Sequence, residues 1–312
     1  MSNTPKQPSV KSYIPELSGM ERVRYRIYRS IVGIFENLSD KQRTTLADFL
    51  SATMWNILRS RRQYTIAAVQ KHLELSLEEA TRIARQSYIE NWRSFLEIFV
   101  VRRFETAAAI RKVNAPEILQ QFGDETAPIV LATAHIGPWE LLGALVSDFS
   151  ATKEKLVVVR SQPDKAVDRL LKEMRSAAGM HVVGHRQASK VVLEELSKYN
   201  NVAGFLVDHN CSRKEAVFLP FFNDIAAVNA GPAMLALRSK AVVYPSFLLR
   251  LPEGGLALHL EPPLYTRDLQ GSIGERVAII AKYYSDCVER VVRLYPEQWF
   301  WMHKRWKTRE TE

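Results

Sequence analysis

One segment of the chain, PIVLATAHIGPWE at residues 128–140, combines the residue types of general acid–base chemistry. An apolar run of strand character ends at His135, and Glu140 follows five positions later. A carboxylate beside an imidazole fixes the tautomer of the ring and stabilises the imidazolium that forms when the ring accepts a proton. We therefore expect His135 to act as a general base and Glu140 to be its partner.

The spacing of this pair is a weak signal, whereas its position is a stronger one. Seven histidines and 34 acidic residues in 312 positions produce one such pair by chance. Pro138 favours a helix start just after His135, because proline is well tolerated in a first helical turn. His135 would then lie at the carboxyl end of a strand, where open α/β sheets bind ligands. A capping Glu140 beside an unrelated His135 is the alternative interpretation.

Other catalytic signatures are missing from the sequence. It contains no G-x-S-x-G, G-x-x-x-x-G-K-[ST], G-x-G-x-x-G, H-E-x-x-H or C-x-x-C motif. This disfavours serine hydrolases, P-loop enzymes, dinucleotide oxidoreductases and zinc enzymes of those types. Cys211 and Cys287 are too few for a disulfide framework, which favours a reducing compartment. We expect neither a metal nor a cofactor.

Beyond residue 115, short apolar runs alternate with helical stretches. Strands are expected at residues 129–134, 156–159, 202–207, 242–249 and 256–260, and helices at 165–178, 189–199, 230–239 and 273–294. Such alternation predicts a sheet covered by helices. The Pro-Glu-Gly-Gly turn at 252–255 predicts a hairpin, so some neighbouring strands are antiparallel. The expected fold class is α/β, with a mixed, mainly parallel sheet flanked by helices and an N-terminal helical lobe.

The expected organisation has three parts: a flexible arm at residues 1–20, the helical lobe at 21–115 and the α/β domain at 116–312. Helices are expected from residue 21 to about 62 and from about 88 to 111. Another is expected to begin near Ser76, where Ser76 and Glu79 have the spacing of a capping box.

The first helix combines an apolar stripe with clustered arginines. The stripe consists of Ile27, Ile31, Ile34, Phe35 and Leu38, and the arginines are Arg22, Arg24, Arg26 and Arg29. Residues 1–62 hold 11 Lys and Arg against 5 Asp and Glu, so this segment carries most of the net charge of +9 of the whole chain. A basic region indicates an anionic partner. The helix either lies on an anionic membrane surface or docks on the protein's own core.

No stretch of the sequence is expected to span a bilayer. The longest charge-free runs have about a dozen residues, fewer than the roughly 20 that a spanning helix needs. The N-terminal residues lack the apolar stretch of a signal peptide. We therefore expect a cytoplasmic protein that is either soluble or rests on a membrane surface.

The last block of the chain is rich in tryptophan and in basic residues. Trp299, Trp301 and Trp306 alternate with Lys304, Arg305, Lys307 and Arg309. This pattern can bind single-stranded nucleic acid through stacking and phosphate contacts. We favour an aromatic edge packed on the core with its basic side facing headgroups, and we expect no nucleic-acid partner.

Several blocks resemble a known family. The H-x4-[DE] spacing of His135 and Glu140 resembles that of the glycerolipid acyltransferase superfamily, and AHIGPWELLGAL at 134–145 is similar to the motif of bacterial lipid A late acyltransferases, the lauroyl and myristoyl transferases. Further similar blocks are VVVR at 157–160, GFLVD at 204–208, FLPFF at 218–222, GPAMLA at 231–236 and PEQWFWMHKRWK at 296–307. They follow the family's order over residues 128–309.

The sequence departs from the family pattern in three ways. Pro138 replaces the usual Asn, and His209 replaces the usual Gln after Asp208. Many members also have an N-terminal spanning helix, which this sequence lacks. These differences concern the hydrogen-bond donors near the site, the mode of membrane attachment and the acceptor.

The resemblance implies a role for each candidate residue. His135 would deprotonate an acceptor hydroxyl, which attacks the thioester carbonyl of the donor directly, without an acyl-enzyme. Glu140 would orient His135. Arg160 would stabilise the oxyanion or hold a phosphate, unless it is an ordinary surface arginine. Asp208 either positions a polar group or caps a turn.

Two further arginines, Arg175 and Arg250, would contact phosphates if they are not simply solvated. The resemblance implies an acyl carrier protein or acyl-CoA as donor, a glycolipid of lipid A precursor type as acceptor, and peripheral attachment at the cytoplasmic face of the bacterial inner membrane. Two alternatives stay open. One is transfer to another amphiphile, such as a lysophospholipid or a mannosylated or amino-acid lipid. The other is a non-catalytic, basic, membrane-associated binding protein.

Overall fold

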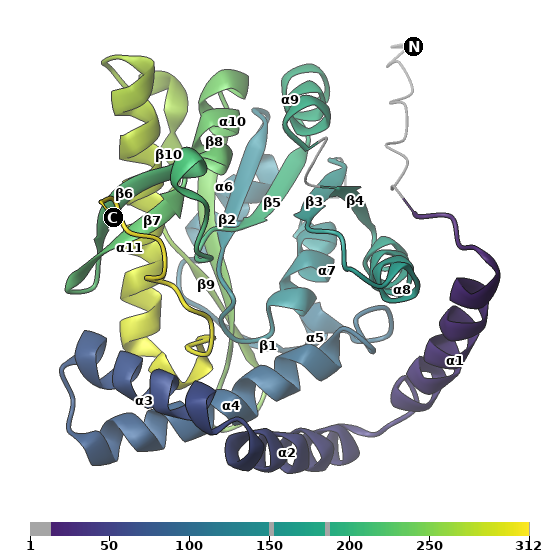
Figure 1. The fold of residues 1–312 in the computed structure, drawn as a ribbon. Helices are drawn as coiled ribbons and strands as arrows, with labels where there is room; N and C mark the ends of the chain where they lie inside the picture. Colours follow the sequence, from purple (N-terminus) through teal and green to yellow (C-terminus); the bar gives the residue numbers. More distant parts are fainter. Residues whose placement is uncertain (1–13, 150–152, 185–187, 312) are drawn as a thin grey trace.

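An eight-stranded sheet runs through the centre of the structure (Figure 1). The computed structural model describes residues 14–149, 153–184 and 188–311, so residues 1–13 of the expected arm lie outside the described residues. The strand order is β1-β9-β8-β2-β5-β3-β4, and β10 pairs with β8. The parallel centre consists of β2 (Ile129–Thr133), β3 (Lys155–Val159), β4 (Met180–Gly184), β5 (Val202–Leu206) and β8 (Val242–Arg250).

Antiparallel pairing occurs at one side of this centre. β9 (Leu256–Leu260) follows the expected hairpin turn and runs antiparallel to β8, as does β10 (Leu264–Tyr265). β1 (Ile110–Val113) is parallel to β9. The predicted mixed, mainly parallel sheet is therefore confirmed. β1 lies before residue 115, so the sheet includes a strand from the predicted N-terminal lobe. The division into a lobe and an α/β domain stays a prediction.

The central strand β2 is buried on both faces, which explains its continuously apolar sequence. Ile129 and Leu131 pack on one side, and the alternate residues Val130 and Ala132 pack on the other. The helices on the first side are α6 (Pro116–Asp124) and α7 (Trp139–Phe149); those on the second are α9 (Ala188–Tyr199), α10 (Gly231–Ser239) and α11 (Ile273–Leu294). β2 therefore lies between two apolar cores, one on each face of the sheet, and these hold it in place.

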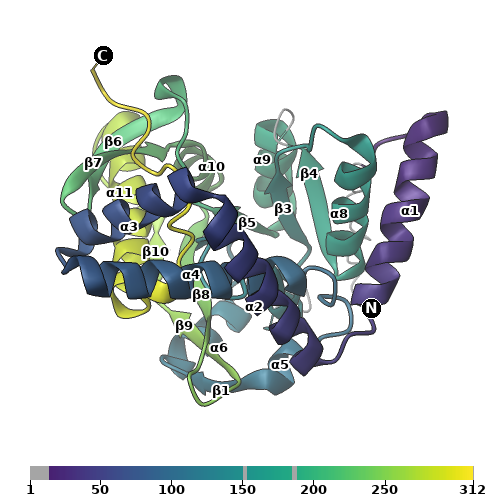
Figure 2. The ribbon, with the colours of Figure 1, turned by 60° about the horizontal axis from the view of Figure 1, so that its bottom comes forward.

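The first four helices of the described residues are α1 (Gly19–Phe35), α2 (Asp40–Ile57), α3 (Arg59–Leu73) and α4 (Leu77–Glu97). Ser39 and Ser76 cap α2 and α4, because each hydroxyl accepts a hydrogen bond from a backbone N–H of the first turn. α2 and α3 pack on α4, whereas α1 stands apart and packs on α8 (Lys165–Ala177) (Figure 2). The N-terminal helices therefore form two groups.

Some observed elements differ from the expected ones. The helical run expected to reach residue 111 is wrong, since α4 ends at Glu97 and is followed by turns, the short α5 (Thr106–Ala109) and β1. β1 escaped the sequence analysis because it exposes Arg111 and Lys112 and so has no apolar run. The hairpin of β6 (Ala216–Phe221) and β7 (Asp224–Asn229) was also not expected; it forms its own sheet and packs on α11.

Candidate active site

The loop after β2 positions His135 at the carboxyl edge of the sheet. The backbone N–H of His135 donates to Asp208 Oδ2 (2.9 Å), and its carbonyl accepts from the N–H of Phe300 (2.9 Å). The next residue, Ile136, forms a β-bridge with Trp299. The loop is therefore held between the end of β5 and the last segment of the chain.

Gly137 makes the sharp turn from this loop into α7 possible. Its φ is +55°, a conformation that disfavours side chains. A Cβ atom at this position would lie 2.2 Å from the carbonyl oxygen of Leu248 in β8. The Gly137 carbonyl in turn accepts a hydrogen bond from Ser94 of α4 (2.7 Å). Glycine is thus required here for both conformation and space.

The carboxylate that holds the imidazole is Asp208. Its Oδ1 lies 2.9 Å from His135 Nδ1, and its Oδ2 accepts a hydrogen bond from the Trp299 indole N–H (2.8 Å). Asp208 follows β5, which is the parallel neighbour of β2, so the two strand ends bring the residues together. The Asp208 side chain is fully buried, whereas the His135 side chain is 26% exposed. No hydrogen bond to His135 Nε2 is present among the described residues.

The pKa values of this pair move in opposite directions. Burial alone would lower the pKa of His135, but the Asp208 carboxylate and, more weakly, Glu140 leave it raised above its ordinary value. Burial alone would raise the pKa of Asp208, but the His135 ring and the Trp299 N–H hold it well below its usual range. Asp208 is therefore ionised at neutral pH, and an imidazole with such a partner has the electrostatics that a general base requires.

Glu140 does not form the expected hydrogen bond with the His135 ring. Its two carboxylate oxygens accept hydrogen bonds from Arg175 of α8, at 2.6 Å and 3.1 Å. Although burial raises the pKa of Glu140, the Arg175 guanidinium keeps it below its ordinary value. In the first turn of α7 the carboxylate faces α8, so the hydrogen-bonded partner of the imidazole is Asp208 instead of the expected Glu140. Glu140 contributes a nearby negative charge.

Aromatic side chains surround the exposed side of the imidazole. Trp139 meets the His135 ring edge-on with centroids 5.4 Å apart, and Phe300 lies 6.1 Å away. Phe95 of α4 contacts both, at 5.5 Å and 5.6 Å, and is itself 36% exposed. These rings give the imidazole an apolar wall that reaches the surface.

The other two candidate arginines differ in their surroundings. Arg160, just after β3, is exposed and makes no ion pair with any residue that the structure describes. Arg250, at the end of β8, is paired with Glu97 (2.6 Å) and Glu90 (3.1 Å) of α4. The Arg250 side chain is only 15% exposed. Arg160 is thus free to meet a ligand, whereas Arg250 ties β8 to α4.

The C-terminal segment contributes groups that the sequence analysis did not assign. Besides Trp299 on Asp208, His303 Nε2 lies 3.0 Å from the backbone carbonyl oxygen of Asp208. Burial lowers the pKa of His303 to about 4, so this ring is neutral at pH 7. Gln298 binds both backbone groups of Arg250 and accepts the Gly137 N–H through its carbonyl. The signal was present, because these residues fall in the PEQWFWMHKRWK block.

The arrangement can accept a proton from a hydroxyl group at an apolar surface. Asp208 holds Nδ1, and Nε2 is the ring nitrogen that has no hydrogen bond to a described residue. Among the described residues, no group of three or more His, Cys, Asp or Glu side chains could hold a metal ion. An imidazole paired with a carboxylate at the carboxyl edge of a mixed α/β sheet, with the sequence blocks described above, is typical of acyltransferases.

The comparison with protein families identifies the acyltransferase family to which the chain is similar. A family model described as bacterial lipid A biosynthesis acyltransferase matches residues 46–308. The chain therefore belongs to this acyltransferase family and is a transferase. The family membership predicted from the sequence blocks is confirmed.

Individual relatives are more distant. The chain is 32% identical to a lipid A biosynthesis lauroyltransferase of Escherichia coli (strain K12) over 126 residues, which cover 40% of this chain and 39% of that protein. It is 23% identical to a palmitoleoyltransferase of lipid A biosynthesis from the same strain over 260 residues, 80% of each chain. It is also 23% identical to a phosphatidylinositol mannoside acyltransferase of Mycolicibacterium smegmatis over 234 residues, 73% of each.

Proposed function

We propose that this protein transfers a fatty acyl chain from a thioester to a hydroxyl group of a glycolipid of lipid A precursor type. The observation that carries the proposal is the His135–Asp208 pair, with 2.9 Å between Nδ1 and Oδ1 and with 26% of the His135 side chain exposed. A general base of this kind activates an alcohol without the need for a nucleophilic side chain.

The reaction follows from this geometry. His135 Nε2 accepts the proton of the acceptor hydroxyl while its oxygen forms a bond to the thioester carbon. The C–S bond then breaks, and the leaving thiolate takes the proton back from the imidazolium. The products are an ester and a thiol. Asp208 stays ionised and stabilises the imidazolium between the two proton transfers.

Arg160 and Glu140 have supporting roles in this proposal. The exposed guanidinium of Arg160 follows β3, which also ends at the carboxyl edge, and would stabilise the oxyanion or bind a phosphate of the acceptor. Glu140 and its partner Arg175 shape the electrostatic potential near His135. Arg250 acts through β8 and α4, so its effect on phosphate binding would be indirect.

α1 is the proposed site of membrane contact. It docks on α8 through Val32 and the hydrogen bond from Tyr25 to Glu173. Its opposite face exposes an apolar stripe, with relative exposures from 43% to 72%: Met20, Val23, Ile27, Ile31 and Ile34. No helix in the described residues is both long and apolar enough to pass through a bilayer. A helix with such a stripe and flanking arginines fits the surface of an anionic membrane, here the cytoplasmic face of the inner membrane.

Transfer assays with purified protein test the proposal. A 14-carbon acyl thioester of carrier protein and one of coenzyme A would each be offered with a lipid A precursor, and the products analysed by mass spectrometry. We expect acylated glycolipid with the wild type and none above background with His135→Ala. If no acceptor consumes thioester faster than the blank without enzyme, the protein is the non-catalytic binding protein instead.

A second acceptor class is favoured by one specific observation, the match to a phosphatidylinositol mannoside acyltransferase over 73% of the chain. A mannosylated lipid and a lysophospholipid would therefore be offered in parallel. A preference for the mannosylated lipid over the lipid A precursor would reassign the acceptor and leave the His135 mechanism intact.

A further inference from the structure

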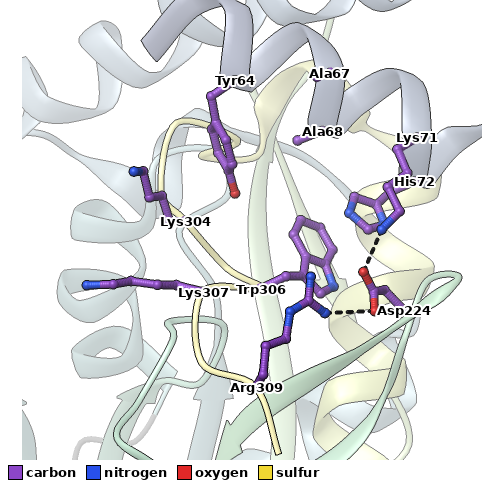
Figure 3. A pocket seen from close by; sticks show the side chains of 10 residues that line it. All are labelled: Tyr64, Ala67, Ala68, Lys71, His72, Asp224, Lys304, Trp306, Lys307 and Arg309. Atoms are coloured by element: carbon purple, nitrogen blue, oxygen red, sulfur yellow. Dashed lines mark hydrogen bonds and ion pairs between the residues drawn. The ribbon is translucent and has the colours of Figure 1, made fainter. Parts of the chain in front are cut away.

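A hollow between α3 and the last residues of the chain is lined by none of the catalytic residues (Figure 3). Its volume is about 300 Å³. The Trp306 ring forms one wall and stacks on His72 with 3.5 Å between ring centroids. On the α3 side, the small side chains of Ala67 and Ala68 leave the space open.

Cations dominate the lining of this hollow. Lys71, Lys304, Lys307 and Arg309 line it, and Asp224 is the one acidic side chain among the lining residues. Asp224 accepts from both Lys71 (2.6 Å) and Arg309 (3.0 Å). Lys304 and Lys307 are exposed and make no ion pair with any described residue. The hollow therefore has a surplus of positive charge and two available ammonium groups.

The titration of two lining groups is consistent with this surplus. Although burial raises the pKa of Asp224, the hydrogen bonds from Lys71 and Arg309 lower it to about 2. Burial lowers the pKa of His72, so its ring is neutral at pH 7 and belongs to the aromatic wall. The only negative charge in the hollow is thus already neutralised by two cations.

The hollow is connected to the catalytic pair through a short segment of chain. Lys304 directly follows His303, whose Nε2 lies 3.0 Å from the Asp208 carbonyl oxygen. Arg61 of α3 donates to the Met302 carbonyl (2.9 Å) and holds the same segment against the helix. Because three residues span at most about 11 Å, Trp306 lies near the catalytic end of the molecule.

We propose that this hollow binds a phosphate group through the ammonium groups of Lys304 and Lys307, which extend to the same side in Figure 3, whereas the Arg309 guanidinium is directed at Asp224. Ammonium groups bind phosphate as point charges. The Trp306 wall leaves room for the carbon skeleton attached to the phosphate. Two sources have this chemistry: the phosphate of a thioester donor, which rests on the proposed function, and the headgroup of an anionic lipid.

Two matched double variants test the site. Lys304→Glu with Lys307→Glu reverses both ammonium charges. The control, Lys112→Glu with Lys190→Glu, makes the same change in net charge at exposed positions in β1 and α9. All four positions are exposed, so both proteins should keep the wild-type circular dichroism spectrum and melting temperature.

The first measurement is calorimetric binding of coenzyme A and of pantetheine, which lacks phosphate. If the donor supplies the phosphate, Lys304→Glu with Lys307→Glu weakens coenzyme A binding at least tenfold, and the control stays within twofold of the wild type. Pantetheine should bind more weakly than coenzyme A to the wild type and equally to all three proteins.

The second measurement is sedimentation with vesicles of phosphatidylglycerol and phosphatidylcholine. If a headgroup supplies the phosphate, the first double variant loses at least tenfold in affinity for phosphatidylglycerol vesicles, whereas its coenzyme A binding equals that of the control. The proposal is overturned if the two double variants bind both coenzyme A and phosphatidylglycerol alike.

Failure of the phosphate site can be distinguished from failure of the proposed function. If the donor supplies the phosphate, transfer from an acyl-pantetheine thioester bypasses the site and should be equal in both double variants. If the wild type shows no transfer from any donor, the proposed function fails, but the binding measurements still decide the phosphate site.

Discussion

The catalytic loop and α1 contrast in how tightly the rest of the molecule holds them. The loop around His135 is tied to β5, α4 and the C-terminal segment through Asp208, Ser94 and Phe300. α1 contacts chiefly α8 and turns its apolar stripe to solvent. A reacting group needs fixed geometry, whereas a membrane-contacting helix needs exposure. The two regions therefore respond to mutation in different assays.

The largest effect on chemistry is expected from His135→Ala. Loss of the general base should reduce kcat for acyl transfer by about 10²- to 10⁴-fold, because the acceptor hydroxyl would have to attack without proton removal. His181→Ala is the matched control, since this histidine lies near the amino end of β4, at the opposite edge of the sheet, and pairs with Glu154. Equal transfer rates for the two variants would remove His135 from the mechanism.

The largest effect on stability is expected from Gly137→Ala. The new Cβ would require both a strained φ and a contact 2.2 Å from the Leu248 carbonyl. We expect the free energy of unfolding in urea to fall by about 4 kcal/mol or more. Gly33→Ala in α1 is the control, because a Cβ there meets nothing within 4 Å. It should leave stability unchanged or raise it by up to about 1 kcal/mol.

Asp208→Asn tests the electrostatic part of the site. In the wild type the pKa of His135 is raised, and only the neutral ring can accept a proton. We therefore expect kcat/KM to rise with pH through this raised pKa. Without the carboxylate, burial dominates the pKa of His135 and lowers it. The acidic limb of the pH–rate profile should therefore move to lower pH. We also expect kcat at pH 8 to fall about 10²-fold, because the imidazolium loses its stabilising partner. An unshifted limb would contradict the assignment of Asp208.

A smaller effect is expected from Glu140→Gln. Its charge also raises the pKa of His135, but its hydrogen bonds go to Arg175. The acidic limb should move in the same direction as in Asp208→Asn, by less, and kcat should fall about tenfold. A loss as large as that of His135→Ala would show that Glu140 contacts the imidazole during turnover.

The smallest effect on chemistry is expected from Ile27→Asp combined with Ile34→Asp in α1. Both side chains are exposed, so the free energy of unfolding should change by no more than about 0.5 kcal/mol. Transfer to a short-chain, detergent-free acceptor should be unchanged, while binding to anionic vesicles falls at least tenfold. Ile273→Asp with Ile279→Asp on α11 is the control. Equal vesicle binding by both would contradict the membrane role of α1.

The sequence predicted the strands that consist of continuous apolar runs. β2, β5 and β8 were recognisable because burial on both faces demands continuous apolar runs. α3 was missed because its residues, rich in arginine and lysine, have no apolar periodicity. β1 was missed because it is itself an edge strand, with Arg111 and Lys112 exposed, and so has no apolar run.

Of the hydrogen-bonded pair at the sheet edge, the sequence pointed to His135 but gave it Glu140 as its partner. Nearness in the sequence suggested Glu140, whereas Asp208 lies 73 positions from His135 and reaches it through the pairing of β2 with β5. No local pattern encodes such a contact. The GFLVD block pointed to Asp208 as a polar residue at the same edge, but the bend at Gly137 decided which carboxylate faces the ring.

The contact between Trp299 and Asp208 has a consequence for the order of synthesis. The base, the acid and the indole that fixes the acid are separated by more than half of the chain, and the indole comes last. A ribosome-bound chain that has not yet released residue 299 therefore lacks the indole that binds Asp208. Acyl transfer would begin only after translation of nearly the whole protein, when the newly made enzyme has all of its helices available.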